Sequence, residues 1–91
     1  MGPDKSNWHS VIYHNDDGHE YELDEWRSYD GPARAEQNAK HHALKSMERG
    51  IPNVSINLRR EYVYTIVSEA SGKVVRRVTI THEISSNTEV L

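Results

Sequence analysis

The chain has no cysteine and no phenylalanine, and only three prolines and five glycines among its 91 residues. Without cysteine it forms neither disulfides nor a cysteine-ligated zinc site. Without phenylalanine, the core has to rest on valine, isoleucine, leucine, tyrosine and tryptophan. A chain of this length buries about 60–65% of its unfolded surface, so its stability is limited. These features indicate one small domain.

Long apolar runs are missing as well. No stretch reaches the roughly 18 apolar residues that cross a bilayer. Residues 1–7 are polar and lack the apolar centre of a signal peptide. We therefore expect a cytoplasmic protein without membrane contact. The sequence also contains no nucleophile elbow, no phosphate-binding glycine loop and no HExxH motif, so we predict that it is not an enzyme and holds no cofactor.

The net charge of −3 is unevenly distributed along the chain. Residues 1–30 hold eight acids and two bases, whereas residues 31–80 hold four acids and nine bases. Such a division suggests two faces of opposite potential, or a solvated surface with uneven statistics.

One long helix is predicted between Pro32 and Gly50. Proline is favoured in the first turn of a helix, and glycine is favoured just past its last turn. Pro52 prevents the helix from continuing. Small or apolar side chains recur every four residues and form one stripe: Ala35, Ala39, Ala43 and Met47. Because three of them are methyl groups, we expect this helix to lie very close to whatever it covers.

The remaining segments alternate between polar and apolar residues, as strands do. The predicted strands are Trp8–His14, His19–Trp26, Asn53–Leu58, Glu61–Ser68 and Lys73–Thr81. Whether 53–68 forms two strands or one bent strand is left open. The order β-β-α-β-β-β predicts a single α+β domain over residues 8–84, in which one helix covers one face of a mainly antiparallel sheet. We expect residues 1–7 and 85–91 to be flexible.

The faces of the sheet follow from the expected pairing. A loop centred on 69–72 would pair Tyr64 with Arg77 and Tyr62 with Thr79. The helix would then cover Val63, Thr65, Val67, Val74, Val78 and Ile80. The first hairpin would pair Ile12 with Tyr21 and leave Tyr13 on the opposite, uncovered face.

An uncovered face rich in tyrosine and arginine is typical of an interaction surface. The residues predicted to bind a protein partner are Tyr13, Glu20, Glu22, Asp24, Tyr62, Tyr64 and Arg77. The acids of this set suit a basic surface on the partner. A homodimer that buries the same face is the structural alternative.

Nucleic-acid binding is the second functional alternative. Tyrosine rings stack on bases and arginine contacts phosphate. The residues available for this are Arg59, Arg60, Tyr62, Tyr64, Arg76 and Arg77. Against it stands the acidic net charge, because nucleic-acid-binding domains usually carry a basic excess.

A metal site is conceivable only at the first turn, where His14, Asp16, Asp17 and His19 gather. The segment from Tyr13 to Asp24 matches a calcium loop only in its middle. We predict no metal ion here, and whether this cluster binds one is left open.

The segment Met47-Glu48-Arg49-Gly50-Ile51-Pro52-Asn53 follows a hairpin and an alanine-rich helix and precedes a strand. In this respect the chain is similar to small phage-encoded anti-CRISPR proteins. The resemblance implies a non-enzymatic phage or mobile-element protein that occupies a surface of a host or defence protein.

Overall fold

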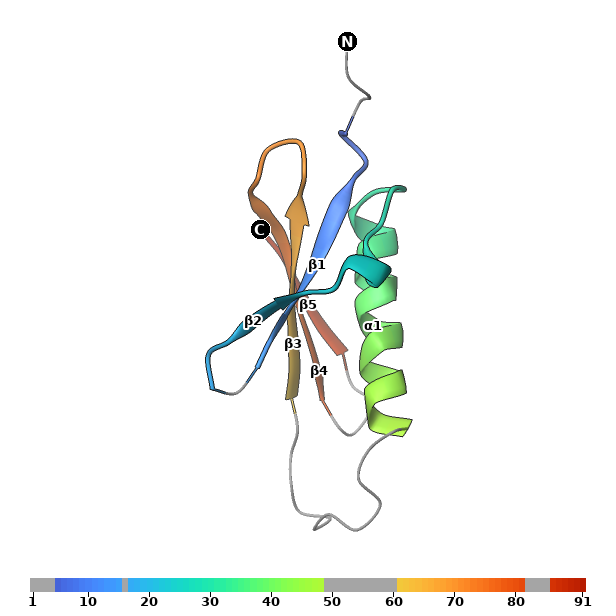
Figure 1. The fold of residues 1–91 in the computed structure, drawn as a ribbon, viewed down its shortest axis with the longest axis vertical. Coiled ribbons are helices and arrows are strands. Elements are labelled where there is room, and N and C mark those ends of the chain that lie inside the picture. Colours follow the sequence, from blue (N-terminus) through green and yellow to red (C-terminus); the bar gives the residue numbers. More distant parts are fainter. Residues whose placement is uncertain (1–4, 16, 49–60, 82–85) are drawn as a thin grey trace.

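The computed structural model describes residues 5–15, 17–48, 61–81 and 86–91. Within them, five strands form one antiparallel sheet in the order β2-β1-β3-β4-β5, and one helix lies against a single face of it (Figure 1). The elements are β1 (His9–His14), β2 (Glu20–Glu22), the 3-10 helix η1 (Asp24–Trp26), α1 (Pro32–Glu48), β3 (Glu61–Ser68), β4 (Val74–Thr81) and β5 (Ser86–Val90). The predicted two-layer α+β class is confirmed.

Helix α1 begins where the sequence predicts. Gly31 precedes it with φ of +100°, a conformation that glycine adopts without strain. Its carbonyl accepts the first helical hydrogen bond, from the N–H of Ala35 at 3.3 Å. The alanines of the predicted stripe, at positions 35, 39 and 43, are fully buried against the sheet. The side chain of Met47 lies outside the described part of the chain, as do Gly50 and Pro52.

The first hairpin has a different register from the predicted one. Ile12 lies opposite Glu22 and not opposite Tyr21, because the turn is one residue shorter than expected. The N–H of Asn15 bonds the carbonyl of His19 at 2.8 Å, and Gly18 has φ of +91°. A three-residue loop that ends in a positive φ is a common hairpin connection. The second strand also ends at Glu22, so the predicted strand over 19–26 is wrong beyond that residue, where η1 follows.

The second hairpin contains a β-bulge that sequence alternation does not announce. Val67 pairs with Val74 as expected, but Ile66 pairs with Arg76, so Val75 is an extra residue on β4. Beyond the bulge every pair is shifted by one residue relative to the prediction, and Tyr64 lies opposite Val78. A bulge of this kind changes which side chains share a face.

The helix covers the face that was predicted to be open. Tyr64 is fully buried, and Tyr62 is 7% exposed. The core lies between α1 and this face of the sheet. It consists of Val11, Ala35, Ala39, Ala43, Tyr62, Tyr64, Ile66, Val78 and Ile80, with Tyr13, Leu23, Trp26 and Val75 packed against it. The prediction that Val63, Thr65 and Val67 lie beneath the helix is therefore wrong.

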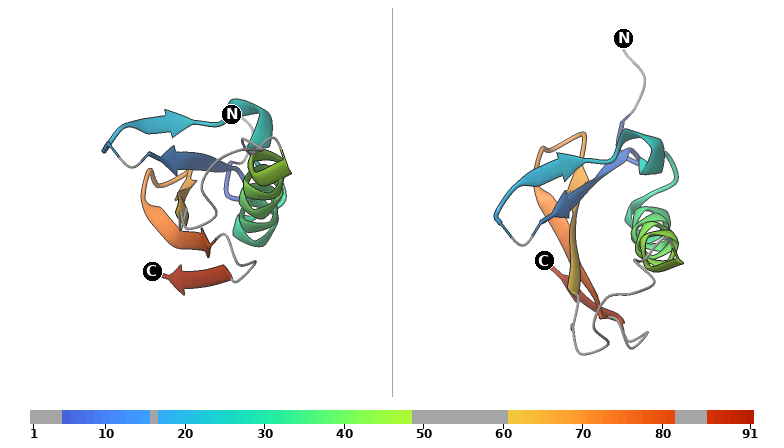
Figure 2. Two further views of the ribbon diagram at one scale, coloured as in Figure 1. Left: turned by 90° about the horizontal axis from the view of Figure 1, so that it is seen from below. Right: turned by 60° about the horizontal axis from the view of Figure 1, so that its bottom comes forward.

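The end of the chain differs from the predicted flexible tail. Ser86–Val90 forms β5, which pairs antiparallel with β4 along its length, from Ile80 opposite Ser86 to Arg76 opposite Val90. The segment is mainly polar and does not alternate with apolar residues, so its sequence did not predict a strand. The strand predicted over 53–58 lies outside the described residues. Figure 2 shows the twist of the sheet, with α1 packed against one side of it.

Candidate functional site

The open face of the sheet is the side of the strands that points away from α1. The pairing assigns to it Ser10, Ile12, His14, Glu20, Glu22, Val63, Thr65, Val67, Val74, Arg77, Thr79, Thr81, Asn87 and Glu89. Ile12, Val63 and Val67 are partly exposed near its middle, and Thr65 between them is 7% exposed. No described element covers this face. It carries fewer aromatic side chains than the surface that the sequence predicts, because Tyr13, Tyr62 and Tyr64 lie on the other face.

The predicted partner-binding residues fall into two groups. Glu20, Glu22 and Arg77 lie on the open face. Tyr13, Tyr62 and Tyr64 do not, because their rings pack together under α1 with centroids 5.4–6.3 Å apart. Their predicted place on the open face is wrong. Asp24 lies in η1, where its side chain is exposed.

The nucleic-acid alternative loses three of its four described residues, because they lie on the helix side of the sheet. Tyr62 and Tyr64 are buried and have no free ring face for a base to stack on. Arg76 points to the helix side, where its Nη1 lies 2.9 Å from Oε1 of Glu36. Arg77 remains on the open face, with its Nη1 3.7 Å from Glu89. Arg59 and Arg60 lie outside the described residues.

Glu36 of α1 forms ion pairs with two basic side chains, Lys40 of α1 and Arg76 of β4. Lys40 Nζ lies 3.1 Å from the second oxygen of Glu36. Burial alone would raise the pKa of Glu36, but hydrogen bonds from Lys40, Thr88 and Arg76 outweigh it and lower that pKa below its usual value. Arg76 is therefore part of the packing between α1 and β4.

The acidic edge of the open face is continuous over β2 and η1. Residues 17–25 contain five acids and no lysine or arginine. On the open face, Nδ1 of His14 lies 3.6 Å from Glu20, and its Nε2 is hydrogen-bonded to the Thr65 hydroxyl at 2.8 Å. Arg27 lies 3.9 Å from Glu22 and 3.7 Å from Asp24 and partly offsets their charge. The side chains of Glu20, Glu22 and Asp24 remain at least half exposed.

At the first turn, the carboxylate of Asp17 is hydrogen-bonded to His19, two residues further along the chain. Its Oδ1 accepts hydrogen bonds from Nδ1 of His19 at 2.9 Å and from the backbone N–H of His19 at 3.1 Å. The side-chain hydrogen bond from His19 is the main cause that lowers the pKa of Asp17. His14 lies opposite Glu20 and not opposite His19. Among the described residues, which leave out Asp16, no three His, Asp or Glu side chains are grouped to hold a metal ion.

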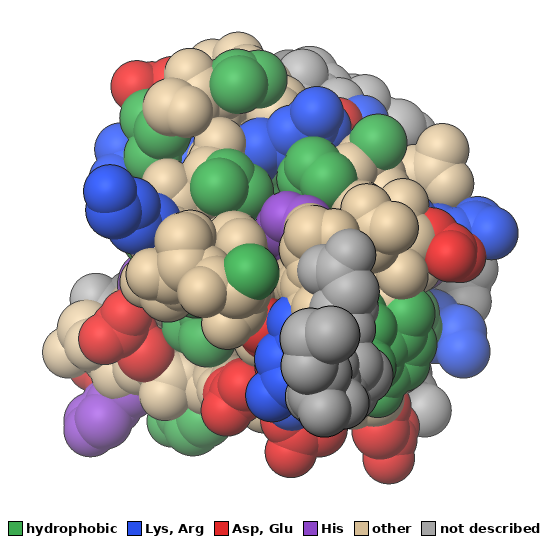
Figure 3. Space-filling model, turned by 90° about the horizontal axis from the view of Figure 1, so that it is seen from above, with side chains coloured by type: hydrophobic (Ala, Val, Ile, Leu, Met, Phe, Trp, Pro, Cys, Tyr) green, Lys and Arg blue, Asp and Glu red, His purple; other side chains and the backbone are tan. Residues whose placement is uncertain are grey.

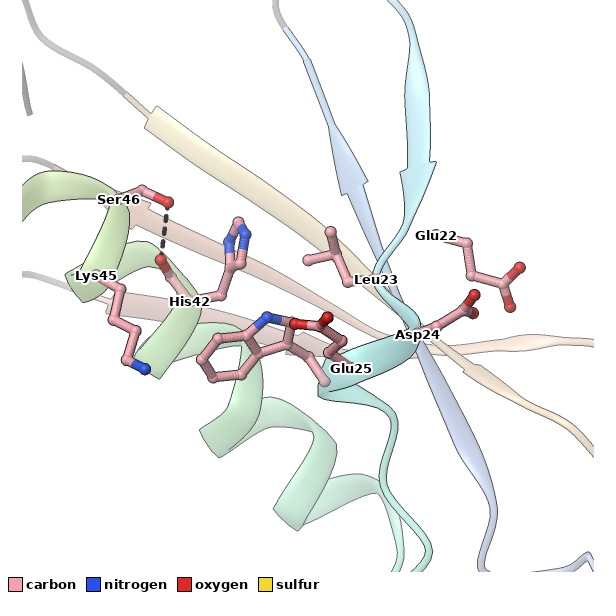
Figure 4. Close-up of a pocket in the computed structure, with 8 residues that line it drawn as sticks. Glu22, Leu23, Asp24, Glu25, His42, Lys45 and Ser46 are labelled. Atoms are coloured by element: carbon pink, nitrogen blue, oxygen red, sulfur yellow. Dashed lines mark hydrogen bonds between the residues drawn. The ribbon is translucent and has the colours of Figure 1, made fainter. Parts of the chain in front are cut away.

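A cavity of about 500 Å³ lies between η1 and the second half of α1. Its lining residues are Glu22, Leu23, Asp24, Glu25, Trp26, His42, Lys45 and Ser46. In Figure 4, His42 and Lys45 project from α1 towards η1, whereas Glu22 and Asp24 point away from the helix. Nζ of Lys45 lies 5.4 Å from the centre of the Trp26 ring, which allows a cation–π contact.

His42 connects this cavity to the core. Its Nδ1 shares a 2.8 Å hydrogen bond with the hydroxyl of Tyr64, and its ring packs edge-on against Trp26 at 5.5 Å. Burial lowers the pKa of His42 and raises that of Tyr64, so both side chains are neutral at pH 7. Two neutral groups joined by a hydrogen bond are compatible with the apolar surroundings.

Sequence reasoning missed this cluster. His42 is not among the residues that the sequence analysis singles out. The available signal was its position three residues after Ala39 and one before Ala43, on the buried stripe.

Among the described residues, ion pairs bring acids and bases together, so the charge division along the sequence is not matched by two separate faces there. Arg27 lies 3.2 Å from Glu69, and Arg76 and Lys40 share Glu36. At the end of the molecule seen from above, basic and acidic side chains alternate around the edge, and hydrophobic ones form small separate groups (Figure 3). The acidic stretch of residues 17–25 runs from the first turn through β2 and η1.

Comparisons of the chain with protein-family models, with curated proteins and with solved structures give no significant match. None of the helices in the described part of the chain has the length and apolar character needed to cross a membrane.

Proposed function

We propose that this protein acts by binding another protein, through the open face of its sheet and the acidic edge beside it. The partner we infer is a basic protein surface. The observation that carries the proposal is the open face itself, where partly exposed Ile12, Val63 and Val67 lie next to the carboxylates of Glu20 and Glu22.

Two physical arguments support a partner of this kind. Exposed apolar side chains grouped on one face gain free energy when a partner removes them from water. The five acids of residues 17–25 create a negative potential beside that face, which steers a positively charged partner towards it. The resemblance to small phage-encoded anti-CRISPR proteins suggests that this partner is a host or defence protein.

The experiment compares two variants with the same change in charge. Glu20→Gln with Glu22→Gln removes two charges from the acidic edge, and Ala33→Lys with Gln37→Lys adds two charges on the exposed side of α1. Both raise the net charge by two. The full chain and each variant serve as bait in a bacterial lysate, and the captured proteins are quantified by mass spectrometry.

The proposal expects at least one protein that the natural chain and the helix variant both capture and that the acidic-edge variant loses. That protein, once purified, should bind less tightly as salt is added, because salt screens exposed charges. If both variants capture the same proteins as the natural chain, the acidic edge is not the contact.

The nucleic-acid alternative is tested with the same purified chains. Retention on single-stranded RNA or on duplex DNA that falls steeply with added salt would favour it. The burial of Tyr62 and Tyr64 argues against this alternative.

A further inference from the structure

The two edges of the sheet differ in how they prevent or permit pairing with another strand. An edge strand exposes unpaired backbone groups and can act as a template for a second strand. β2 is three residues long and carries Glu20 and Glu22 on the same face. If two copies paired through β2 about Tyr21, each Glu20 would lie opposite Glu22 of the other copy. This like-charge contact disfavours pairing at the β2 edge.

β5, at the opposite edge, has no such protection. Its five residues contain no proline, no lysine and a single charge, that of Glu89. Among the described residues, no strand pairs with its outer side. The N–H of Leu91 donates to the carbonyl of Val75 at 3.0 Å. Because backbone direction alternates along a strand, Asn87 and Glu89 also turn their backbone groups to β4. Those of Ser86, Thr88 and Val90 then point outwards.

The sequence of β5 is complementary to itself in the antiparallel direction. About a two-fold axis at Thr88, Ser86 lies opposite Val90 of the second copy, and Asn87 lies opposite Glu89. Thr88 then meets Thr88, a favourable cross-strand pair, and no like charges face each other. The outward backbone groups of Ser86, Thr88 and Val90 coincide with the hydrogen-bonded pairs of this register.

We propose that two copies of this chain pair through β5, so that their two sheets form one continuous sheet. A two-fold axis perpendicular to the sheet places both α1 helices on the same face. The helix packs on β1, β3 and β4, so it leaves the outer side of β5 accessible. Val90 is 70% exposed in the single chain and becomes covered by the second copy. The acidic edge at β2 stays free, so this inference is independent of the proposed function.

Sedimentation equilibrium of the full chain over a range of concentrations tests the pairing. The expected particle has twice the 10.5 kDa mass of the chain. Thr88→Pro removes an outward N–H and should give a folded monomer, because proline is tolerated on an edge strand where its nitrogen faces solvent. Thr88→Val is the matched control. It loses the hydroxyl that bonds Glu36 but keeps the N–H, and should remain a dimer.

A second pair of variants does not depend on how Thr88→Pro folds. Asn87→Glu places two like-charge contacts with Glu89 in each dimer and should raise the dimer dissociation constant by about tenfold. Asn87→Lys places two opposite-charge contacts there and should lower it. A natural chain that stays monomeric up to millimolar concentration overturns the proposal. So does a dimer that responds to neither of the Asn87 variants.

Discussion

The two faces of the sheet use the same strands in different ways. On the face under α1, β3 presents Tyr62, Tyr64 and Ile66, which are at most 7% exposed. On the open face, the same strand presents Val63, Thr65 and Val67, and the two valines remain partly exposed. Both sets are good strand formers. Strand propensity therefore does not distinguish the buried face from the open one.

The difference between the faces comes from the helix. Buried methyl groups at Ala35, Ala39 and Ala43 bring α1 close to the sheet and leave room for large rings opposite. The helix also supplies hydrogen-bond partners for polar groups on this face of the sheet. His42 bonds the Tyr64 hydroxyl, and Glu36 accepts a hydrogen bond from Arg76. Valines in place of the tyrosines would leave a gap below the alanines.

Truncating one side chain on each face should give the largest difference in the free energy of unfolding. We expect Tyr64→Ala to lower the free energy of unfolding by about 3–5 kcal/mol, because it leaves a cavity under α1. Val63→Ala, one residue away on the open face, should cost about 1 kcal/mol or less. Urea denaturation of both variants measures the two losses. Equal losses would contradict the assignment of the faces.

A larger side chain on the buried side of α1 should also affect stability more than the same change on its exposed side. Ala39→Leu adds volume where the helix meets the tyrosines and should cost about 1–3 kcal/mol. Ala33→Leu makes the same change on the exposed side of α1 and should cost nearly nothing. Thermal unfolding followed by circular dichroism gives both values. A neutral Ala39→Leu would mean that the helix does not lie close to the sheet.

Removing a single hydroxyl gives a smaller effect. Tyr64→Phe keeps the ring but leaves Nδ1 of His42 without its 2.8 Å partner. We expect a loss of about 1 kcal/mol in urea denaturation at pH 7. Tyr21→Phe serves as the control, because that side chain is 48% exposed. The two substitutions should differ even though their chemistry is identical.

The smallest expected effect is a dependence on pH. Burial lowers the pKa of His42 in the folded chain below the value near 6.5 that it has when unfolded. The unfolded chain therefore binds the proton first, so the contribution of His42 to stability is present above pH 6.5 and is lost as the pH falls below it. Free energies of unfolding measured between pH 5 and 8 should fall less steeply towards acid for His42→Gln. An unchanged slope would show that His42 is not buried in the neutral form.

Much of the fold followed from local patterns. Pro32 predicted where α1 begins, because proline is favoured in the first turn of a helix, and alternation predicted the strands that became β1, β3 and β4. The acidic character of Glu20, Glu22 and Asp24 was also readable, because charge is a property of the residues themselves. These features depend on neighbours along the chain.

The candidate site was predicted less well. The placement of Tyr13, Tyr62 and Tyr64 on the open face failed, and the cavity beside His42 and Trp26 was missed. Alternation along β3 defines two sets of side chains but does not say which set is buried. The bulge at Val75 then moved Val78 and Ile80 to the side of the tyrosines, and no glycine or proline marks that bulge in the sequence.

The sequence by itself therefore determined helix α1, the strands β1, β3 and β4, their order and the charge of each segment, because helix-start residues and periodicity act over a few residues. The tertiary structure alone decided which face of β3 the helix covers, that Ser86–Val90 joins the sheet, and that His42 and Tyr64 meet. Those outcomes depend on the side-chain volumes and hydrogen-bond partners of segments that are far apart in the chain. Such segments interact only when the helix packs against the sheet.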